Sequence, residues 1–246
     1  MKKKLFNTFF DNLKTVFYAL IIAVLIRSLF FQPFYIPSSS MEPTLLIGDR
    51  IFVKKFTYGY SKHSFPFSPP FFSNRIFNKK PKRGDLVVFK TPADNRTDYI
   101  KRLIGLPGDT IQFLNGKLFL NKNEILRTLV NKKYKIRCGP LSRDVNAYEE
   151  TLPNGKKYIA VYASKGSMKK TDEYKVPAGH FFFLGDNRDC SKDSRFLSSV
   201  GYVSNENLVG KASIIFFSND TVSGSIFKFW NWGESLRIKR FFSLLK

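Results

Sequence analysis

The sequence predicts a mainly β protein that follows one N-terminal membrane-spanning helix. Two observations support this fold class. After residue 32, short runs rich in Val, Ile, Phe and Tyr alternate with Gly, Pro, Asn and Asp, a pattern typical of short strands joined by turns. Before it, Lys14 and Gln32 enclose an apolar segment that approaches the length of a bilayer crossing. The 246 residues suffice for one sizeable domain or two smaller ones.

The N-terminal apolar segment predicts an uncleaved anchor at residues 15–31. Lys2, Lys3 and Lys4 precede it, and Arg27 near its outer end can extend its guanidinium to the interface. A cleaved secretory signal peptide is the alternative, but no A-x-A-like cleavage site follows. By the positive-inside rule, residues 1–14 lie in the cytoplasm and the chain after Gln32 lies outside.

The strands are predicted from apolar runs bounded by turn residues. One pair of runs is joined by Asn115-Gly116, which is a strong signal for a two-residue hairpin. The runs are residues 50–56, 85–90, 110–114, 117–120, 181–184 and 211–217.

Three segments interrupt this strand pattern. Residues 57–82, with Pro66, Pro69 and interleaved aromatic residues, predict an extended loop or a protruding hairpin. Residues 110–178 are polar and lysine-rich, which indicates an insertion or a second small domain. Residues 223–246 form a basic aromatic tail that suits an interfacial amphipathic segment, a final strand or a packing helix.

The charge balance is strongly basic, with 41 Lys and Arg against 19 Asp and Glu. Nucleic acid, an anionic membrane surface or plain solvation would each suit a net charge of +22. No zinc-finger, RRM or basic-zipper pattern occurs, so we expect no nucleic-acid partner. The 27 Phe residues suggest an exposed apolar face for lipid or peptide.

Metal and disulfide chemistry have few candidates. Cys138 and Cys190 are too few for a disulfide framework or a Cys-rich zinc site, and a single disulfide between them stays open. His63 and His180 are the only histidines, and no HExxH or Walker A motif occurs. We therefore expect neither a metal nor an organic cofactor.

A serine-rich stretch and one lysine are the residues with the clearest chemical potential. Ser38, Ser39 and Ser40 follow the anchor so closely that they must lie near the bilayer surface. Lys101 stands among Ile100, Leu103 and Ile104, and burial in such surroundings would lower its pKa and leave a neutral amine. The alternative for Lys101 is an ordinary surface lysine.

Five motifs along the chain resemble those of the bacterial type I signal peptidases. Residues 40–45 read S-M-E-P-T-L and residues 83–89 read R-G-D-L-V-V-F. Residues 99–109 read Y-I-K-R-L-I-G-L-P-G-D, and residues 185–195 read G-D-N-R-D-C-S-K-D-S-R. The last, residues 207–212, is N-L-V-G-K-A. Cys190 stands where the family usually has Asn, and the anchor is single where some members have two.

The resemblance implies a serine endopeptidase with a Ser–Lys dyad. Ser40 would be the nucleophile and Lys101 the general base. Ser38 would donate its hydroxyl to the oxyanion hole beside the Ser40 backbone N–H, and Ser191 would orient the Lys101 amine. Structural support would come from four charged residues, Asp186, Arg188, Asp193 and Arg195.

The resemblance also implies the architecture, the substrate and the location. The family has an antiparallel β catalytic domain, here residues 32–109 and 179–222, with a smaller β domain inserted at 110–178. Its substrates are signal peptides of exported preproteins, cut after small residues at −1 and −3 outside the bacterial plasma membrane. The sequence predicts no oligomeric state. Four aromatic residues are expected to enter the lipid interface, namely Phe30, Phe31, Phe34 and Tyr35. The residues expected to line the substrate pockets are Ile36, Pro37, Met41, Leu45, Tyr99 and Ile100.

Three other functions were weighed against this one. Ser167 to Lys170 fit the S-x-x-K pattern of penicillin-binding proteins and β-lactamases, but neither S-D-N nor K-T-G follows. A self-cleaving repressor would need DNA-binding helices where the apolar segment stands. A tethered binding protein without activity would have lost Ser40 or Lys101 first.

Overall fold

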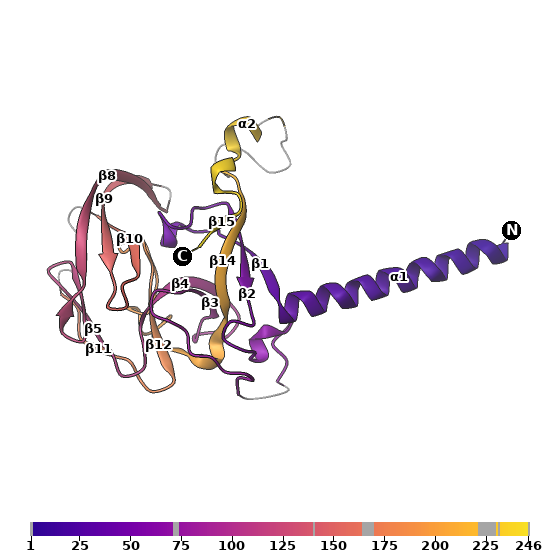
Figure 1. The fold of residues 1–246 in the computed structure, drawn as a ribbon, viewed down its shortest axis with the longest axis horizontal. Helices are drawn as coiled ribbons and strands as arrows, with labels where there is room; N and C mark the ends of the chain where they lie inside the picture. The colour runs from indigo at the N-terminus through magenta and orange to yellow at the C-terminus, as the bar shows by residue number, and fades with distance from the viewer. Residues whose placement is uncertain are drawn as a thin grey trace.

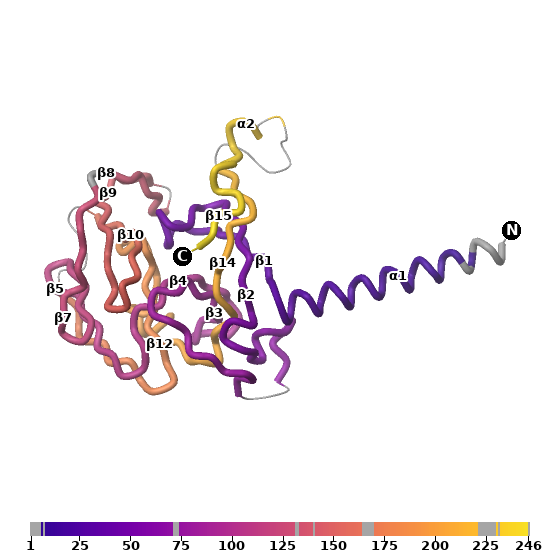
Figure 2. Tube along the Cα trace, viewed as in Figure 1, coloured from indigo at the N-terminus to yellow at the C-terminus, as the bar shows by residue number. Residues whose placement is uncertain are grey.

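The computed structural model describes residues 2–70, 74–139, 141–163, 170–220, 230 and 232–245. It consists of one long N-terminal helix and a body of antiparallel strands, which confirms the predicted mainly β fold class. Figure 1 shows the helix projecting from the body, and Figure 2 shows the described chain ending against the body beside β14 and β15.

Helix α1 (Lys2–Leu29) contains no glycine or proline and carries the apolar segment. Its part Thr8–Leu29 is long and apolar enough to cross a membrane by length and composition, and the body does not cover it. The helix ends earlier than residue 31, the predicted end of the anchor, because Phe31 already pairs with Lys54 in an antiparallel ladder. Two hydrogen bonds hold this exit, from Lys55 N to Phe30 O (3.0 Å) and from Tyr60 Oη to Leu29 O (2.8 Å).

The larger sheet has eight antiparallel strands. Its path runs β1 (Phe31–Tyr35), β2 (Asp49–Lys54), β14 (Leu208–Ser218), β3 (Leu86–Lys90), β4 (Asp98–Gly105), β12 (His180–Leu184) and β13 (Val203–Ser204), and β15 (Ser243–Leu244) pairs with β14. Strand β2 alternates buried and half-buried residues, whereas the side chains of β3 are buried from Leu86 to Phe89. A core therefore lies on each face of the sheet, one around Ile51, Val53 and Val88 and the other around Phe89 and Phe183.

Two smaller sheets are built from residues 110–175. One orders β10 (Lys157–Tyr162), β9 (Leu141–Thr151) and β8 (Leu126–Cys138), and the other orders β11 (Tyr174–Lys175), β5 (Thr110–Leu114), β6 (Lys117–Leu120) and β7 (Asn123–Glu124). Asn115 and Gly116 both have positive φ between paired Leu114 and Lys117, so the predicted hairpin is confirmed.

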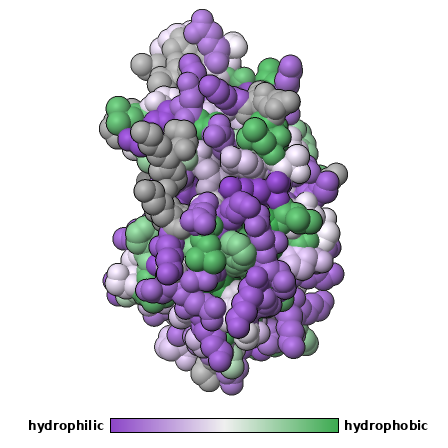
Figure 3. Space-filling view, turned by 90° about the vertical axis from the view of Figure 1, so that its left-hand side faces the viewer, coloured by the Kyte–Doolittle hydropathy of each residue, from purple (hydrophilic) through white to green (hydrophobic). Residues whose placement is uncertain are grey.

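The smaller sheets have one apolar cluster of their own, around Ile136 and Val145, and share a larger one with the eight-stranded sheet. Ile111, Phe113 and Leu120 pack in one cluster with Ile104 of β4 and with Phe182 and Leu184 of β12. The predicted separation of 110–178 as a domain stays a prediction, and the shared cluster shows that this segment is packed tightly against the larger sheet. Figure 3, which views the side opposite α1, shows a mostly hydrophilic face with scattered apolar side chains.

Two less regular segments complete the described chain. Within residues 57–82, Tyr60 and Ile76 form an isolated antiparallel bridge, and a single turn of 3₁₀ helix, η2 (Lys62–Ser64), lies between them in the chain. Near the C-terminus, α2 (Trp232–Ser235) and a 3₁₀ turn η5 (Ile238–Arg240) lead into β15. Of the predicted tail, residues 223–246, the residues 223–229, 231 and 246 lie outside the described part of the chain.

Candidate active site

Ser40 and Lys101, which are 61 residues apart in sequence, meet in the body of the protein. Ser40 lies in a 3₁₀ turn, η1 (Ser39–Met41), directly after β1, and Lys101 lies in β4. The Lys101 Nζ atom is 2.6 Å from Ser40 Oγ. Both residues are buried, with Ser40 8% and Lys101 3% exposed. A buried amine and a hydroxyl in direct hydrogen-bond contact have the geometry of a nucleophile and its base.

The turn that carries Ser40 is held by residues of the loop after β12. Asn187 donates its backbone N–H to Ser40 O (3.2 Å) and its side-chain Nδ2 to Ser39 O (3.1 Å). A Cβ atom on Gly185 would overlap both the Ser191 side chain and the Ser40 carbonyl oxygen. Only glycine therefore allows this loop to approach Ser40 so closely.

The surroundings of Lys101 favour a neutral amine. Burial lowers the pKa of Lys101 to about 8, against the attraction of the Asp193 and Asp186 carboxylates, which raise it. The amine also donates to Ile100 O (3.0 Å) and lies 5.3 Å from the centre of the Tyr99 ring. Near neutral pH a useful fraction of this lysine is therefore able to accept a proton.

Ser38 lies at the mouth of the site. Its Oγ is 3.3 Å from Ser40 Oγ, and either hydroxyl can be the donor. Its side chain is exposed and its backbone is extended (φ −130°, ψ 155°), so the hydroxyl reaches the reacting oxygen from the solvent side. The structure thus brings Ser38, Ser40 and Lys101 together.

The structure records no hydrogen bond between Ser191 and the Lys101 amine. The hydrogen bonds of the Lys101 amine go to Ser40 and Ile100, and the buried Ser191 hydroxyl has no hydrogen-bond partner of normal geometry among the described residues. Ser191 packs against Gly185, close to the Ser40 carbonyl oxygen. Its expected role in orienting the base stays a prediction.

Two of the predicted supporting carboxylates are buried and paired. Arg102 holds Asp186 through two hydrogen bonds, Nε to Oδ1 (2.7 Å) and Nη2 to Oδ2 (2.6 Å), and Thr44 also donates to Asp186 (2.5 Å). Asp193 accepts from Arg195 and from the backbone N–H of Gly185 (2.9 Å). Burial raises the pKa of Asp193, but the Arg195 charge and these hydrogen bonds lower it more, so the carboxylate is held below its usual range.

The partners of Arg188 were not found from the sequence. Its guanidinium forms a bidentate pair with Glu150 of β9 (2.7 and 3.2 Å). The Tyr158 and Tyr162 hydroxyls of β10 donate to the same carboxylate. Glu150 is a single acidic residue in a polar segment, and only the pairing of β9 with β10 reveals that it is buried beneath the loop. This cluster ties the smaller sheets to the loop that positions Ser40.

A cleft of about 430 Å³ opens beside the Ser40–Lys101 contact. Five of the six residues predicted to contact substrate line it, namely Ile36, Pro37, Met41, Tyr99 and Ile100. Leu45 does not, because the chain turns after η1 and places this side chain in the core with Ile51 and Val53. The lining also includes Phe34, Val88, Cys190 and Lys192, of which the sequence had indicated none as a substrate contact.

Cys138 and Cys190 form a disulfide. It joins the end of β8 to the loop that lines the cleft, so the pairing left open by the sequence is present in the structure. No group of three or more His, Cys, Asp or Glu side chains that could hold a metal ion occurs among the described residues. Residues 167–169 of the alternative S-x-x-K pattern lie outside them.

Comparison with known families decides the class of the chain. The family model described as "Signal peptidase, peptidase S26" matches residues 9–217, which is most of the sequence. The chain belongs to the peptidase S26 family. It is therefore a serine endopeptidase, as the sequence predicted.

Individual relatives of this S26 peptidase agree with the family match. Signal peptidase I of Rickettsia canadensis is 42% identical over 93% of this chain and 91% of its own length, and that of Rickettsia typhi is 40% identical over 93% and 90%. A crystal structure of a signal peptidase I from Enterococcus faecalis is 26% identical and covers 54% of this chain and 97% of that chain, with a TM-score of 0.32. The family and the two Rickettsia relatives support signal-peptide removal as the reaction, and α1 fits a membrane anchor.

Proposed function

We propose that this S26 peptidase removes signal peptides from exported preproteins, with Ser40 as nucleophile and neutral Lys101 as general base. The observation that carries the proposal is the 2.6 Å contact between a buried lysine amine and a buried serine hydroxyl beside an open cleft. In a serine peptidase such a pair supplies both the nucleophile and its activation.

The two groups act in acylation as follows. Neutral Lys101 accepts the proton of Ser40 Oγ while that oxygen attacks the carbonyl carbon of the scissile peptide bond. The resulting ammonium of Lys101 returns the proton to the nitrogen of the departing chain, and the C–N bond breaks. The signal peptide is then held as an ester on Ser40. In deacylation Lys101 takes a proton from water, the hydroxide attacks the ester, and Ser40 recovers its proton.

Negative charge on the carbonyl oxygen is stabilised at the mouth of the cleft. We assign this role to the Ser38 hydroxyl and the backbone N–H of Ser40. The assignment is supported by the 3.3 Å separation of the two hydroxyl oxygens, which brings Ser38 within reach of a group bonded to Ser40 Oγ. A donor of this kind contributes about 3 kcal/mol to transition-state stabilisation.

The substrate is proposed to add to an open strand edge. Strand β12 pairs with β4 at Arg102, Leu103 and Gly105, so the preceding part of β4 has a partner only in β3. The Tyr99–Ile100 edge that remains lines the cleft. An extended peptide can pair with such an edge while alternate side chains enter the apolar lining. The cleavage rule of small residues at −1 and −3 follows from the shallow cleft that Ile36, Met41 and Ile100 would then leave.

The membrane orientation is part of the same proposal. With Lys2, Lys3 and Lys4 in the cytoplasm, α1 crosses the bacterial plasma membrane once and the body lies outside. Phe30, Phe31 and Tyr35 are exposed where the chain leaves the helix, which suits contact with lipid. The cleft begins at Phe34 and Tyr35, so the dyad is set close to the bilayer.

The proposal is tested by cleavage of a preprotein that carries an A-x-A site, using the full chain in detergent. Wild type is expected to cut after the −1 residue, and Ser40→Ala and Lys101→Met are each expected to lose activity by about 10⁴-fold or more. Ser39→Ala, a neighbouring serine, and Lys175→Met, an exposed lysine, serve as matched controls that keep the activity. Thermal unfolding checks that every variant is folded. Equal cleavage by wild type and both dyad variants would contradict the assignment.

A further inference from the structure

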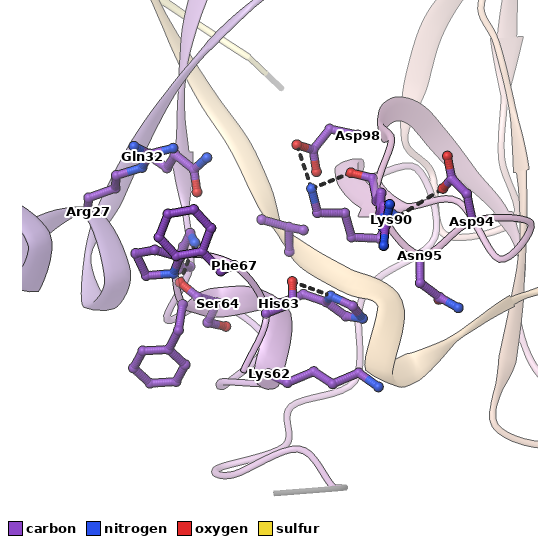
Figure 4. A pocket seen from close by; sticks show the side chains of 16 residues that line it. Arg27, Gln32, Lys62, His63, Ser64, Phe67, Lys90, Asp94, Asn95 and Asp98 are labelled. Atoms are coloured by element: carbon purple, nitrogen blue, oxygen red, sulfur yellow. Dashed lines mark hydrogen bonds and ion pairs between the residues drawn. The ribbon is translucent and has the colours of Figure 1, made fainter. Parts of the chain in front are cut away.

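A second cavity, of about 550 Å³, lies where the helix meets the body. It is enclosed by the end of α1, the start of β1, the loop around η2 and the turn between β3 and β4 (Figure 4). Asp98 is the one residue that lines both this cavity and the cleft beside Ser40. The reaction proposed above gives the cavity no role.

The lining of this cavity is strongly cationic. Five basic side chains face two carboxylates, Asp94 and Asp98. The basic residues are Arg27, Lys55, Lys62, Lys90 and Arg96. Lys90 pairs with Asp98 (2.9 Å), and Asp94 is occupied by the Thr91 and Thr97 hydroxyls and by backbone N–H groups. The other four basic side chains have no ion pair with a carboxylate in the part of the chain that is described.

Lys55 is the most unusual of these cations because it is buried. Its side chain is only 2% exposed, and its Nζ donates to Ser64 O (2.5 Å). An ammonium group has three N–H donors, so two remain for another acceptor. Burial, followed by the charge of Arg27, lowers the pKa of Lys55 to about 8. Asp98 offsets part of this effect, and an anion in the cavity would supply an acceptor and a further counter-charge.

The position of the cavity indicates where such an anion comes from. Arg27 lies in the last turn of α1, and Gln32 and Lys55 flank the point at which the chain leaves the helix. Phe67 in the cavity wall is fully exposed, and Figure 4 shows it on the same side as Arg27 and Gln32. Basic and aromatic side chains at the end of an apolar helix are typical of the headgroup layer of a membrane.

We propose that this cavity is a binding site for a phosphate group, held by Lys55, Arg27, Lys62 and Arg96. A phospholipid headgroup and free inorganic phosphate present the same chemistry, and the location favours the headgroup of an anionic lipid. The lipid source rests on the proposed membrane insertion of α1, whereas phosphate binding itself does not. Neither depends on Ser40 or Lys101.

The test measures binding to the full chain in detergent, separately from cleavage. Native mass spectrometry would count lipids retained after addition of phosphatidylglycerol or, in a parallel arm, phosphatidylcholine. A third arm titrates inorganic phosphate against the retained phosphatidylglycerol. The variants are Lys55→Met and the pair Arg27→Gln with Lys62→Gln. The matched control is Lys79→Gln with Lys80→Gln, which removes the same charge from exposed lysines outside the cavity.

Wild type and the control pair are expected to retain one phosphatidylglycerol, and the cavity variants to bind it about tenfold more weakly. The pair Arg27→Gln with Lys62→Gln, an exposed and a half-buried side chain, gives a result even where Lys55→Met fails to fold. If millimolar phosphate displaces the retained phosphatidylglycerol, and phosphatidylglycerol and phosphatidylcholine bind equally well, the site is supported but its ligand is free phosphate. Equal retention by wild type and the cavity variants would overturn the proposal. If wild type binds the lipid but does not cleave the preprotein, that result would count against the proposed peptidase site alone.

Discussion

At the scale of single residues, the proposed proton transfer depends on the burial of the Lys101 amine. Lys101 stands in β4 with its side chain enclosed by Tyr99, Ser40 and the loop after β12. Removal from water penalises the charged form, and the Asp193 and Asp186 carboxylates offset only part of that penalty. The burial that positions the proposed base therefore also lowers its pKa.

The pH dependence of cleavage follows from this. The pKa of Lys101 is lowered from 10.5 to about 8, so the amine is mostly charged and inactive below that value and mostly neutral above it. We expect kcat/KM to rise about tenfold per pH unit below about 8 and to level off above it. A series of kcat/KM measurements from about pH 6 to about pH 10 would show this limb, and a flat profile would contradict Lys101 as the base.

The oxyanion role of Ser38 predicts a different kinetic signature. Ser38→Ala removes a donor that acts only when charge develops on the carbonyl oxygen, because the ground-state carbonyl does not need it. We expect kcat to fall on the order of 10²-fold with little change in KM. Ser38→Thr keeps the hydroxyl and is expected to restore part of the rate. A rise in KM alone would show that Ser38 binds substrate instead.

At the scale of elements, residues near the C-terminus contact the loop that follows the Ser40 turn. Arg240 in η5 donates to Asp49 Oδ2 (2.6 Å) and to Thr44 O (3.0 Å), and Arg237 donates to Ile47 O (2.8 Å). The tail predicted as a possible lipid-surface segment thus includes a part that braces the loop between η1 and β2.

Loss of this brace is expected to reduce both stability and activity. Arg240→Met leaves the fully buried Asp49 carboxylate with fewer partners. We expect this to lower the free energy of unfolding by about 2 kcal/mol, less than for a fully buried pair, because the Arg240 side chain is partly exposed. Urea unfolding would measure the change, and Lys239→Met, an exposed neighbour, is the control. An unchanged midpoint for Arg240→Met would show that Ser218 and Leu46, which also bond Asp49, are sufficient.

The elements also show why some residues were predictable and others not. Ser40 and Lys101 stand in motifs of fixed order, so their roles could be expected before any strand was placed. Leu45 belongs to the same motif, but the turn after Met41 sends it into the core, and no spacing reveals that turn. Glu150 could not be predicted because its burial depends on which strand pairs with β9. The surroundings of Ser191 depend on how closely Gly185 packs against it. Long-range pairing decides these positions.

At the scale of the whole molecule, the larger and smaller sheets are joined around the site. The Arg188–Glu150 pair is one connection, and the Cys138–Cys190 disulfide is another. Both end on the loop that holds Ser40. The smaller sheets are therefore attached directly to the loop that lines the cleft.

Removal of the disulfide tests this connection. It closes a loop with a sequence separation of 52, for which chain entropy predicts about 4 kcal/mol of stabilisation. We expect Cys138→Ser with Cys190→Ser, or reduction of wild type, to lower the free energy of unfolding by up to that amount. Urea unfolding with and without reductant would measure it. If the double variant loses no stability, the Arg188 cluster and the shared apolar core hold the sheets together without the disulfide.

The fixed exit of α1 has a consequence for which substrates can be cut. Leu29 and Phe30 are hydrogen-bonded to the body through Tyr60 and Lys55, and only β1 and a few residues separate them from Ser40. In the proposed membrane orientation, the fold therefore fixes the distance of Ser40 from the bilayer surface. Such an enzyme would select preproteins whose apolar segment ends at a matching depth, and would not cut equally good cleavage sequences that lie too far from the membrane or too deep in it.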